Sequence, residues 1–326
     1  MRLAGLLAIA LGAALLATLC GGTWIDPAQV LRALVHPRPD DVSTIVWQLR
    51  LPRVAIGAVT GASLGVAGAL LQGMLRNPLV DPYLTGVSAG AAVAIVAGTI
   101  AGVTFAALPL LGFCAGIAAA LLVAALARRG AGLDSTRLIL AGVALSSLFS
   151  AAIALMLTRL PVGAAAPAIL GWLAGSLSGR GWSELAFCSP YVAAGLVCAL
   201  AAVPSLNALR LGDVRAASAG VDVARAQWLI LGGASLLTAS SVVLAGTVGF
   251  VGLLVPHIAR RAVGSDARLV LPASAVAGAA IVMAADAACR TIAAPAEIPL
   301  GVLLAFLGVP AFLYFYLRSE RAAAAA

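Results

Sequence analysis

The sequence of 326 residues has no lysine and few charged residues of any kind. All 20 basic residues are arginine, and charged residues make up 10% of the chain against 63% hydrophobic residues. A soluble domain is about a quarter charged, so this composition excludes an ordinary soluble domain and a disordered chain. The absence of lysine excludes a Walker A phosphate loop and a Schiff-base lysine. The chain therefore does not bind and hydrolyse ATP by that route itself.

Cysteine and aromatic residues are also scarce. The five cysteines form no CxxC pair and all lie in apolar surroundings, so we interpret them as small buried hydrophobes rather than as a disulfide or metal framework. The net charge of +8 could indicate nucleic acid, but the arginines would then cluster with aromatics on a polar face. Here they interrupt apolar runs, as in membrane proteins. No nucleic-acid partner, metal or cofactor is expected. The cysteines are Cys20, Cys114, Cys188, Cys198 and Cys289.

Long apolar runs dominate what is present, with a mean hydropathy of +1.10. A bilayer core needs roughly 20 apolar residues per helix. The run at 82–127 is long enough for two helices, and the run at 226–259 for one full helix and a short one. The sequence thus predicts an all-α, polytopic membrane protein of about ten helices in a single domain, 1–326. The runs free of Asp, Glu and Arg are 3–25, 54–75, 82–127, 138–158, 185–209, 226–259, 269–285 and 298–317.

The arginines predict the orientation of these spans. Ten spans place both ends of the chain on one side. With the N-terminus inside, 13 arginines fall in inner segments and 7 in outer segments, which favours cytoplasmic termini. The uncharged run 160–179 is rich in glycine and proline, so we expect an outer loop with short helical pieces. Residues 1–22 could instead be a signal peptide, leaving nine spans, although Leu19 before Cys20 is larger than a cleavage site prefers.

Three local features have two interpretations each. Gly57, Gly61 and Gly65 form overlapping GxxxG steps, which suit either a helix beside a translocation path or subunit seam, or plain internal packing. The segment 76–82 holds two prolines and breaks the helix, so it either lies buried against a water-filled cavity or forms a tight cytoplasmic turn. The segment 204–226 is the longest cytoplasmic insert, and either docks a soluble partner through two short helices or is a solvated loop.

Several separate motifs occur along the chain in one order: Arg50-Leu-Pro-Arg53, Arg76-Asn-Pro-Leu79, Gly86-Val-Ser-Ala-Gly90, Leu211-Gly-Asp213, Gly249-Phe-Val-Gly and Pro295-Ala-Glu-Ile-Pro-Leu-Gly301. In this order they resemble the FecCD-type permeases, over about residues 45–320. The resemblance implies a cobalamin-permease-like fold with ten helices per subunit and a homodimer with the path at its centre. It also implies two cytoplasmic ATP-binding subunits, a periplasmic substrate-binding protein and the bacterial inner membrane.

The resemblance also assigns roles to single residues. Arg50, Arg53 and Arg290 match outward arginines that meet acidic residues of the binding protein, and guanidinium–carboxylate pairs suit such docking. For Arg290 the alternative is an ion pair with Asp286 one helical turn earlier. Charge reversal of Arg50 is expected to slow transport.

Two predicted gates lie along the path. Asn77 and Leu79 match an inner constriction of the family, and Ser135 and Thr136 match a second. Small polar side chains can line a path without holding cargo tightly. The alternative for the segment around Ser135, which follows Asp134, is N-capping of the helix that begins near Leu138.

The segment 207–225 matches the coupling helices that contact the ATPase subunits. Its matching residues are Leu211, Gly212, Asp213, Ala219 and Gly220. His257, with no second histidine nearby in the sequence, is interpreted as structural rather than as a metal ligand.

The function predicted is ATP-driven alternating access for a metal chelate: a ferric siderophore, haem or cobalamin. An ion-coupled secondary transporter is the alternative, and it would need intramembrane carboxylates that load and release ions. Asp286 and Glu297 are the only acids near the last two spans. The sequence does not choose among the cargoes.

Overall fold

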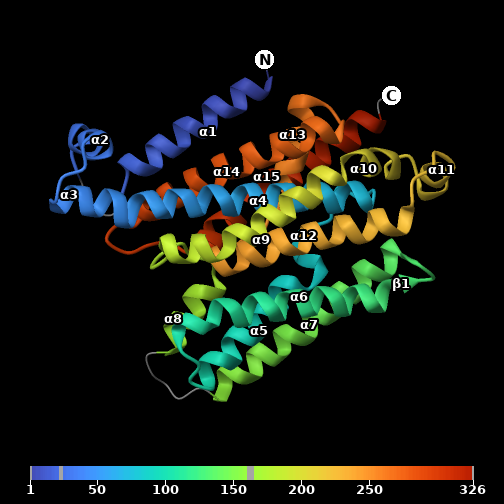
Figure 1. The fold of residues 1–326 in the computed structure, drawn as a ribbon, viewed down its shortest axis with the longest axis horizontal. Coiled ribbons are helices and arrows are strands. Elements are labelled where there is room, and N and C mark those ends of the chain that lie inside the picture. The colour runs from blue at the N-terminus through green and yellow to red at the C-terminus, as the bar shows by residue number, and fades with distance from the viewer. Residues whose placement is uncertain (1, 22–24, 160–164, 325–326) are drawn as a thin grey trace.

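The computed structural model describes residues 2–21, 25–159 and 165–324, which are almost entirely helical (Figure 1). The first half contains α1 (Arg2–Leu19), α2 (Pro27–Val35), α3 (Asp41–Thr44), the π-helix η1 (Ile45–Arg50), α4 (Leu51–Met74), η2 (Pro82–Thr85), α5 (Val87–Ile100), η3 (Phe105–Ala107), α6 (Leu108–Ala127) and α7 (Ser135–Arg159). The second half contains α8 (Ala165–Leu173), α9 (Trp182–Ala201), α10 (Val203–Leu209), α11 (Asp213–Ser218), α12 (Val223–Ala245), α13 (Val251–Val263), α14 (Ala267–Ile292) and α15 (Leu300–Ala324).

The helical membrane architecture predicted from the apolar runs is confirmed. In the described part of the chain, six helices are long and apolar enough to cross a membrane: α4 with its N-terminal extension, α6, α7, α9, α12 and α14. Shorter apolar helices occur at Leu3–Leu19, Val87–Ile100 and Leu300–Tyr314. α13 has 13 residues. Every predicted span therefore contains a helix, whereas the number of ten crossings stays a prediction.

Two local elements differ from the expectation. Helix begins at Asp41 and continues to Met74, although the uncharged run begins only at 54. The π-helix lies directly before Pro52, where a wider turn accommodates a residue without a backbone N–H donor. A two-strand antiparallel hairpin, β1 (Arg128–Arg129) and β2 (Gly132–Leu133), joins α6 to α7.

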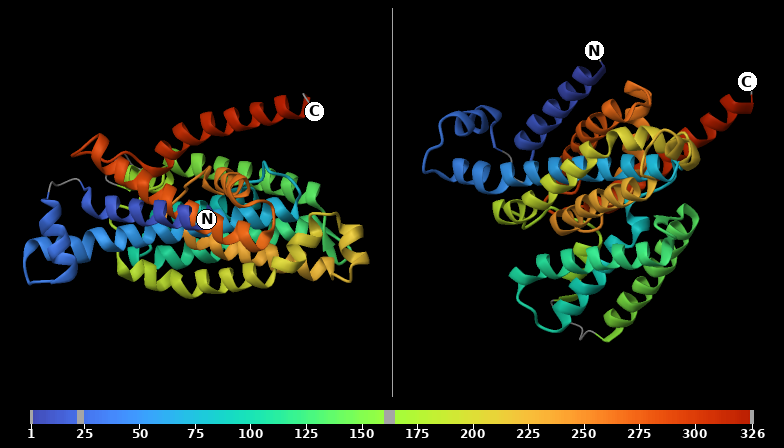
Figure 2. Two further views of the ribbon diagram at one scale, coloured as in Figure 1. Left: turned by 90° about the horizontal axis from the view of Figure 1, so that it is seen from above. Right: turned by 45° about the vertical axis from the view of Figure 1, so that its right-hand side comes forward.

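The core lies where α4 is surrounded by α12, α13 and α14. α1 runs alongside α14 in the same direction, through small residues such as Ala13 and Ala17. α5, α6 and α7 form a second group below α12 in Figure 1, and α6 and α5 contact α12. α15 extends away from the other helices, as the left view of Figure 2 shows. The right view of Figure 2 shows the second group beneath α4, α9 and α12.

The long helices give the molecule two ends. The "α3 end", on the left of Figure 1, holds α2, α3 and α8. The "α11 end", on the right, holds α10, α11 and the β1–β2 hairpin. The predicted outer loop at 160–179 corresponds in part to α8, a single helix of nine residues, and residues 160–164 lie outside the described part of the chain.

Candidate functional site

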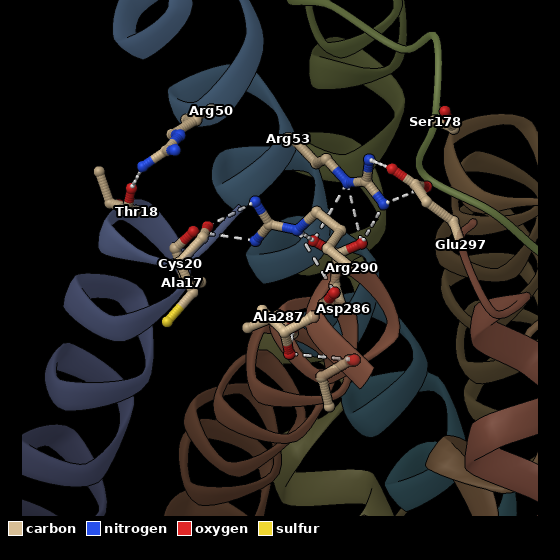
Figure 3. A network of polar contacts seen from close by, with 12 residues as sticks. Ala17, Thr18, Cys20, Arg50, Arg53, Ser178, Asp286, Ala287, Arg290 and Glu297 are labelled. Atoms are coloured by element: carbon tan, nitrogen blue, oxygen red, sulfur yellow. Dashed lines mark hydrogen bonds and ion pairs between the residues drawn. The ribbon is translucent and has the colours of Figure 1, made fainter. Parts of the chain in front are cut away.

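At the α3 end, Arg53 of α4 makes ion pairs with two carboxylates from the last third of the chain (Figure 3). Its Nη2 lies 2.9 Å from Oδ1 of Asp286, and its Nη1 lies 2.9 Å from Oε1 of Glu297. Nε of Arg53 also donates to Asp286 Oδ1 at 3.0 Å. Asp286 belongs to α14 and Glu297 precedes α15, so this arginine connects three parts of the fold.

Arg290 shares the carboxylate of Asp286. Its Nε lies 3.0 Å from Oδ2 of Asp286, so the intrahelical ion pair considered from the sequence is present. Nη1 donates to the carbonyl of Cys20 at 3.0 Å, and Nη2 to the carbonyl of Ala17 at 2.9 Å. The last carbonyls of a helix have no partner within the helix, and cations near them are stabilising. Arg290 therefore caps α1 from α14.

Arg50 caps the same helix from the other side. Its Nη1 donates to the carbonyls of Thr18 and Leu19 at 3.0 and 2.7 Å. Arg50 and Arg290 are each only 4% exposed. Their contacts are internal to the chain, whereas Glu297, with 36% of its side chain exposed, leaves the Arg53 pair open to solvent on one side. Of the three predicted docking arginines, Arg53 is thus the one that a partner could reach most directly.

At the α11 end, α10 and α11 form two short helices joined by a turn. Gly212 and Gly220 flank α11 with φ of 110° and 83°, which favours glycine at both positions. Leu211 is 65% exposed, and Ala219 is also exposed. Asp213 lies 3.5 Å from Arg76, which is two residues beyond the end of α4. The predicted coupling residues therefore form an exposed protrusion that contacts the end of α4.

The two predicted gates lie on different segments. Asn77 and Leu79 lie between α4 and η2, where the Leu79 N–H donates to Asn77 Oδ1 at 2.9 Å and the Leu79 side chain is exposed. This break is ordered, because buried Gln72 donates from Nε2 to the carbonyl of Val80 at 3.1 Å. Pro78, also in this break, lines a cavity. Arg76, Pro78 and Leu79 are exposed whereas Val80 and Pro82 are buried, so the choice between a buried break and a tight turn stays a prediction.

Ser135 and Thr136 form the first turn of α7. The capping group is Asp134, whose Oδ1 accepts from the N–H of Arg137 at 2.9 Å. That hydrogen bond lowers the pKa of Asp134, and the nearby Arg129 lowers it further. Ser135 is half-buried and Thr136 is exposed. Because Asp134 accepts the N-terminal hydrogen bond, the gate role of the two hydroxyl residues stays open.

The glycines of α4 face α14 of the same chain. A Cβ placed on Gly61 would lie 2.1 Å from the carbonyl oxygen of Gly278, and one on Gly65 would lie 2.4 Å from that of Ser274. A Cβ on Gly57 would lie 3.3 Å from a side-chain carbon of Leu177. The GxxxG groove therefore packs α4 against α14 at backbone distance.

No metal centre is found in the described part of the chain, where no three His, Cys, Asp or Glu side chains group together. The five cysteines are free thiols. Cys188 and Cys289 are buried as expected, but Cys114 is exposed on α6, so the prediction of burial was wrong there. It faces outward on a helix with an apolar exposed surface, where a thiol is tolerated as a small hydrophobe.

Two contacts between distant residues could not be found from the sequence. Arg53 and Asp286 are 233 residues apart, and Arg260 and Gln72, which share a short hydrogen bond, are 188 apart. The only available signal was local: Arg290 one turn after Asp286.

Comparison with known proteins gives the family. The model of the FecCD transport family matches residues 7–318. The chain belongs to the FecCD transport family. The cobalamin import system permease protein BtuC of Halobacterium salinarum is 40% identical over 281 residues, covering 85% of this FecCD chain and 74% of the relative. The hemin transport system permease protein HmuU of Yersinia pestis is 37% identical, with coverage of 89% and 88%.

A solved structure described as a metal-chelate type ABC transporter in an inward-facing conformation has the same fold. Its TM-score is 0.86 with 29% identity, over 97% of this FecCD chain and 98% of the other. The relatives are transport permeases, and this FecCD chain is a membrane-embedded transporter subunit and not an enzyme.

Proposed function

We propose that the chain is the membrane-spanning permease subunit of an ABC importer that moves a metal chelate from periplasm to cytoplasm. The observation that carries the proposal is the likeness over 97% of the chain to a metal-chelate type ABC transporter. The cargo classes are those of the relatives: cobalamin, hemin and, for the iron(3+)-hydroxamate permease FhuB of Bacillus subtilis, a ferric siderophore.

The proposed topology has ten spans, with both termini in the cytoplasm and the chain in the inner membrane. α1 runs toward the α3 end and α15 away from it (Figure 1), as expected when both termini are on one side. The α11 end holds Arg76, Arg128, Arg210 and Arg215, and cytoplasmic segments are enriched in arginine. The α11 end is therefore the cytoplasmic one in this proposal.

We propose a homodimer whose path lies beside α7. In the apolar window of α7 only 11% of the residues are buried, compared with 78% for the α4 helix. Its exposed side includes Thr136, Ser147 and Ser150 among apolar residues. The hydroxyl of Ser147 donates to the carbonyl of Val143 within α7, so the support for the shared path is the large exposed surface of this helix, which a second copy would cover.

The partners would bind at opposite ends. Two ATP-binding subunits would contact the exposed α10–α11 segment, and their closure on ATP would move the helices attached to it. A substrate-binding protein would dock at the α3 end, with an acidic side chain competing with Glu297 for Arg53. In alternating access the permease has two states, one open to each side of the membrane. Each partner would shift the equilibrium between them only if it makes different contacts with the two states. No resident cofactor is part of this proposal.

The alternative of an ion-coupled transporter is not favoured. Asp286 and Glu297 both make ion pairs with Arg53, and Asp286 also pairs with Arg290. Both carboxylates are therefore already occupied by arginines of the same chain, which leaves neither of them as an open site for a transported ion.

Uptake by reconstituted vesicles tests the proposal. We expect uptake to need the ATP-binding subunits, ATP and the binding protein, and to continue after ionophores remove all ion gradients. Uptake by the permease alone, driven by a gradient, would contradict it. Binding assays on the substrate-binding protein with haem, cobalamin and ferric siderophores would then assign the cargo.

A further inference from the structure

A cavity of about 250 Å³ opens at the α11 end, apart from the arginines of the α3 end. Three arginines from separate segments line it: Arg76 after α4, Arg210 after α10 and Arg260 in the last turn of α13. Apolar residues of α4, α10 and α14 complete its wall, among them Leu206 and Val270. Figure 1 shows α10, α13 and the end of α4 meeting in this region.

A buried glutamine holds Arg260 in place. Nε2 of Gln72 donates to the carbonyls of Val80, Gly252 and Leu253 at 3.1, 3.2 and 3.1 Å. With its amide nitrogen held in this way, Gln72 presents Oε1 to Arg260, whose Nη2 donates to it. The guanidinium is therefore fixed at the cavity wall by a neutral partner, and its positive charge is not neutralised there.

The positive charges of the cavity are incompletely compensated. Arg210 and Arg260 line the same cavity, and the hydrogen-bond partner of Arg260 is the neutral amide of Gln72. Arg210 takes part in none of the ion pairs found among the described residues. Two guanidiniums thus lie close together at one cavity, an arrangement that an anion between them would stabilise.

Of the two carboxylates nearby, Asp213 pairs weakly with the cavity arginine Arg76, and Asp266 accepts hydrogen bonds from other groups. Asp213 lies 3.5 Å from Arg76, with both side chains 41% exposed, so this ion pair is weak. Asp266 accepts from Asn207 Nδ2 at 2.8 Å and from the N–H of Arg268 at 2.9 Å, although Arg210 lies near enough to lower its pKa. Neither carboxylate lines the cavity.

We infer that this cavity binds a phosphate group, carried either by a free anion or by the headgroup of an anionic phospholipid. Guanidinium groups form paired, charge-assisted hydrogen bonds with phosphate oxygens. Basic pockets at the cytoplasmic ends of membrane helices attract anionic headgroups. A phosphate here would join the ends of α4, α10 and α13 and hold the α10–α11 segment against the bundle. Binding of a lipid headgroup rests on the proposed cytoplasmic side of the α11 end, whereas binding of free phosphate does not.

The test uses the purified full-length permease without its partners. Binding is then measured independently of transport, so the result can be interpreted even if the proposed transport function is wrong. Inorganic phosphate is titrated into delipidated protein in detergent by calorimetry. In a parallel arm, native mass spectrometry measures phosphatidylglycerol retained from mixed phosphatidylglycerol and phosphatidylcholine micelles. Arg210→Gln is the main variant, because Arg210 makes no side-chain hydrogen bond among the described residues. Arg215→Gln, an exposed arginine of α11 outside the cavity, is the matched control.

We expect Arg210→Gln to weaken binding about tenfold or more in at least one arm, while Arg215→Gln binds as the unaltered protein does. Arg76→Gln is a second variant that should act in the same direction. An effect in the phosphate arm identifies a free anion, and an effect only in the lipid arm identifies a headgroup. Equal binding by the Arg210→Gln, Arg76→Gln and control proteins in both arms, or no binding in either, would overturn the inference.

Discussion

The carboxylate of Asp286 lies 2.9 Å from the guanidinium of Arg53, although 233 residues separate the two in the chain. Only 3% of the Asp286 side chain is exposed, and its second oxygen pairs with Arg290. One acid thus compensates two arginines that belong to α4 and α14.

Removing that acid is expected to destabilise the fold strongly. Asp286→Asn leaves Arg290 buried without a full ionic partner, and breaking a buried pair costs about 3–5 kcal/mol. We expect a large fall in the thermal unfolding midpoint in detergent. Glu297→Gln, which removes a half-exposed acid, should cost less than about 1 kcal/mol. Equal losses in the two variants would contradict the central role of Asp286.

Because α4 contacts α14 so closely, adding a single methyl group at the contact is expected to lower the free energy of unfolding. Gly61→Ala places a Cβ against the carbonyl of Gly278, so the helices must separate. Overpacking of this kind costs about 1–3 kcal/mol or more. Gly232→Ala in α12, where nothing lies within 4 Å, should be neutral or stabilising by up to about 1 kcal/mol. Thermal unfolding of both variants measures the difference, and a stable Gly61→Ala protein would refute the contact.

The proposed second gate predicts that transport and ATP hydrolysis can be separated. A variant with Ser135→Trp and Thr136→Trp should lose cargo uptake while the assembled transporter still hydrolyses ATP, because bulk blocks the path and leaves the α10–α11 segment unchanged. Ala131→Trp at the tip of the neighbouring hairpin adds one tryptophan at an exposed position and should transport normally. Normal uptake by the double tryptophan variant would remove these residues from the path.

The weak ion pair between Asp213 and Arg76 predicts a functional effect without a structural one. Asp213→Asn should change the free energy of unfolding by less than about 1 kcal/mol, because both side chains are solvated. We expect ATP-dependent uptake to fall, since α11 loses its contact with the end of α4. Ser218→Ala, on the same helix, is the control. If uptake is unaffected in both variants, this contact does not transmit motion.

The hydrogen bonds that join Asn207 of α10 to Asp266 and Ala267 at the start of α14 predict a dependence of stability on pH. The N–H of Arg268 and the side chain of Asn207 lower the pKa of Asp266 below its ordinary value of 3.8. A lowered pKa contributes stability above the ordinary value, and that stability is lost as the pH falls through the lower folded value. The difference in unfolding midpoint between the unaltered protein and Asp266→Asn should therefore shrink below pH 3.8. A constant difference at lower pH would contradict this.

The helices were predictable because each apolar run is a local property. The start of the α4 helix was not, because Arg50 and Arg53 interrupt the uncharged run that marked the span. These charges are accommodated by carbonyls of α1 and by acids near the other end of the sequence. The spacing of Asp286 and Arg290 predicted one ion pair, whereas the partners of Arg53 depend on how α4 and α14 pack.

The arginine-lined cavity at the α11 end could not be found from the sequence for a similar reason. Each of its arginines ends a different apolar run, so each is explained individually by membrane orientation. Only packing brings Arg210 and Arg260 to one wall, and only the fold aligns Gln72 with the last turn of α13. Hydropathy could not distinguish them from arginines that face solvent.

The backbone contact between Gly61 and Gly278 has a mechanical consequence. Because a Cβ on either glycine would clash with the backbone of the other helix, we expect α4 and α14 to move together as one rigid beam. One end of this beam bears Arg53, and the other bears Gln72 and Arg76. A force applied at either membrane surface would then reach the opposite surface as a tilt of the whole beam.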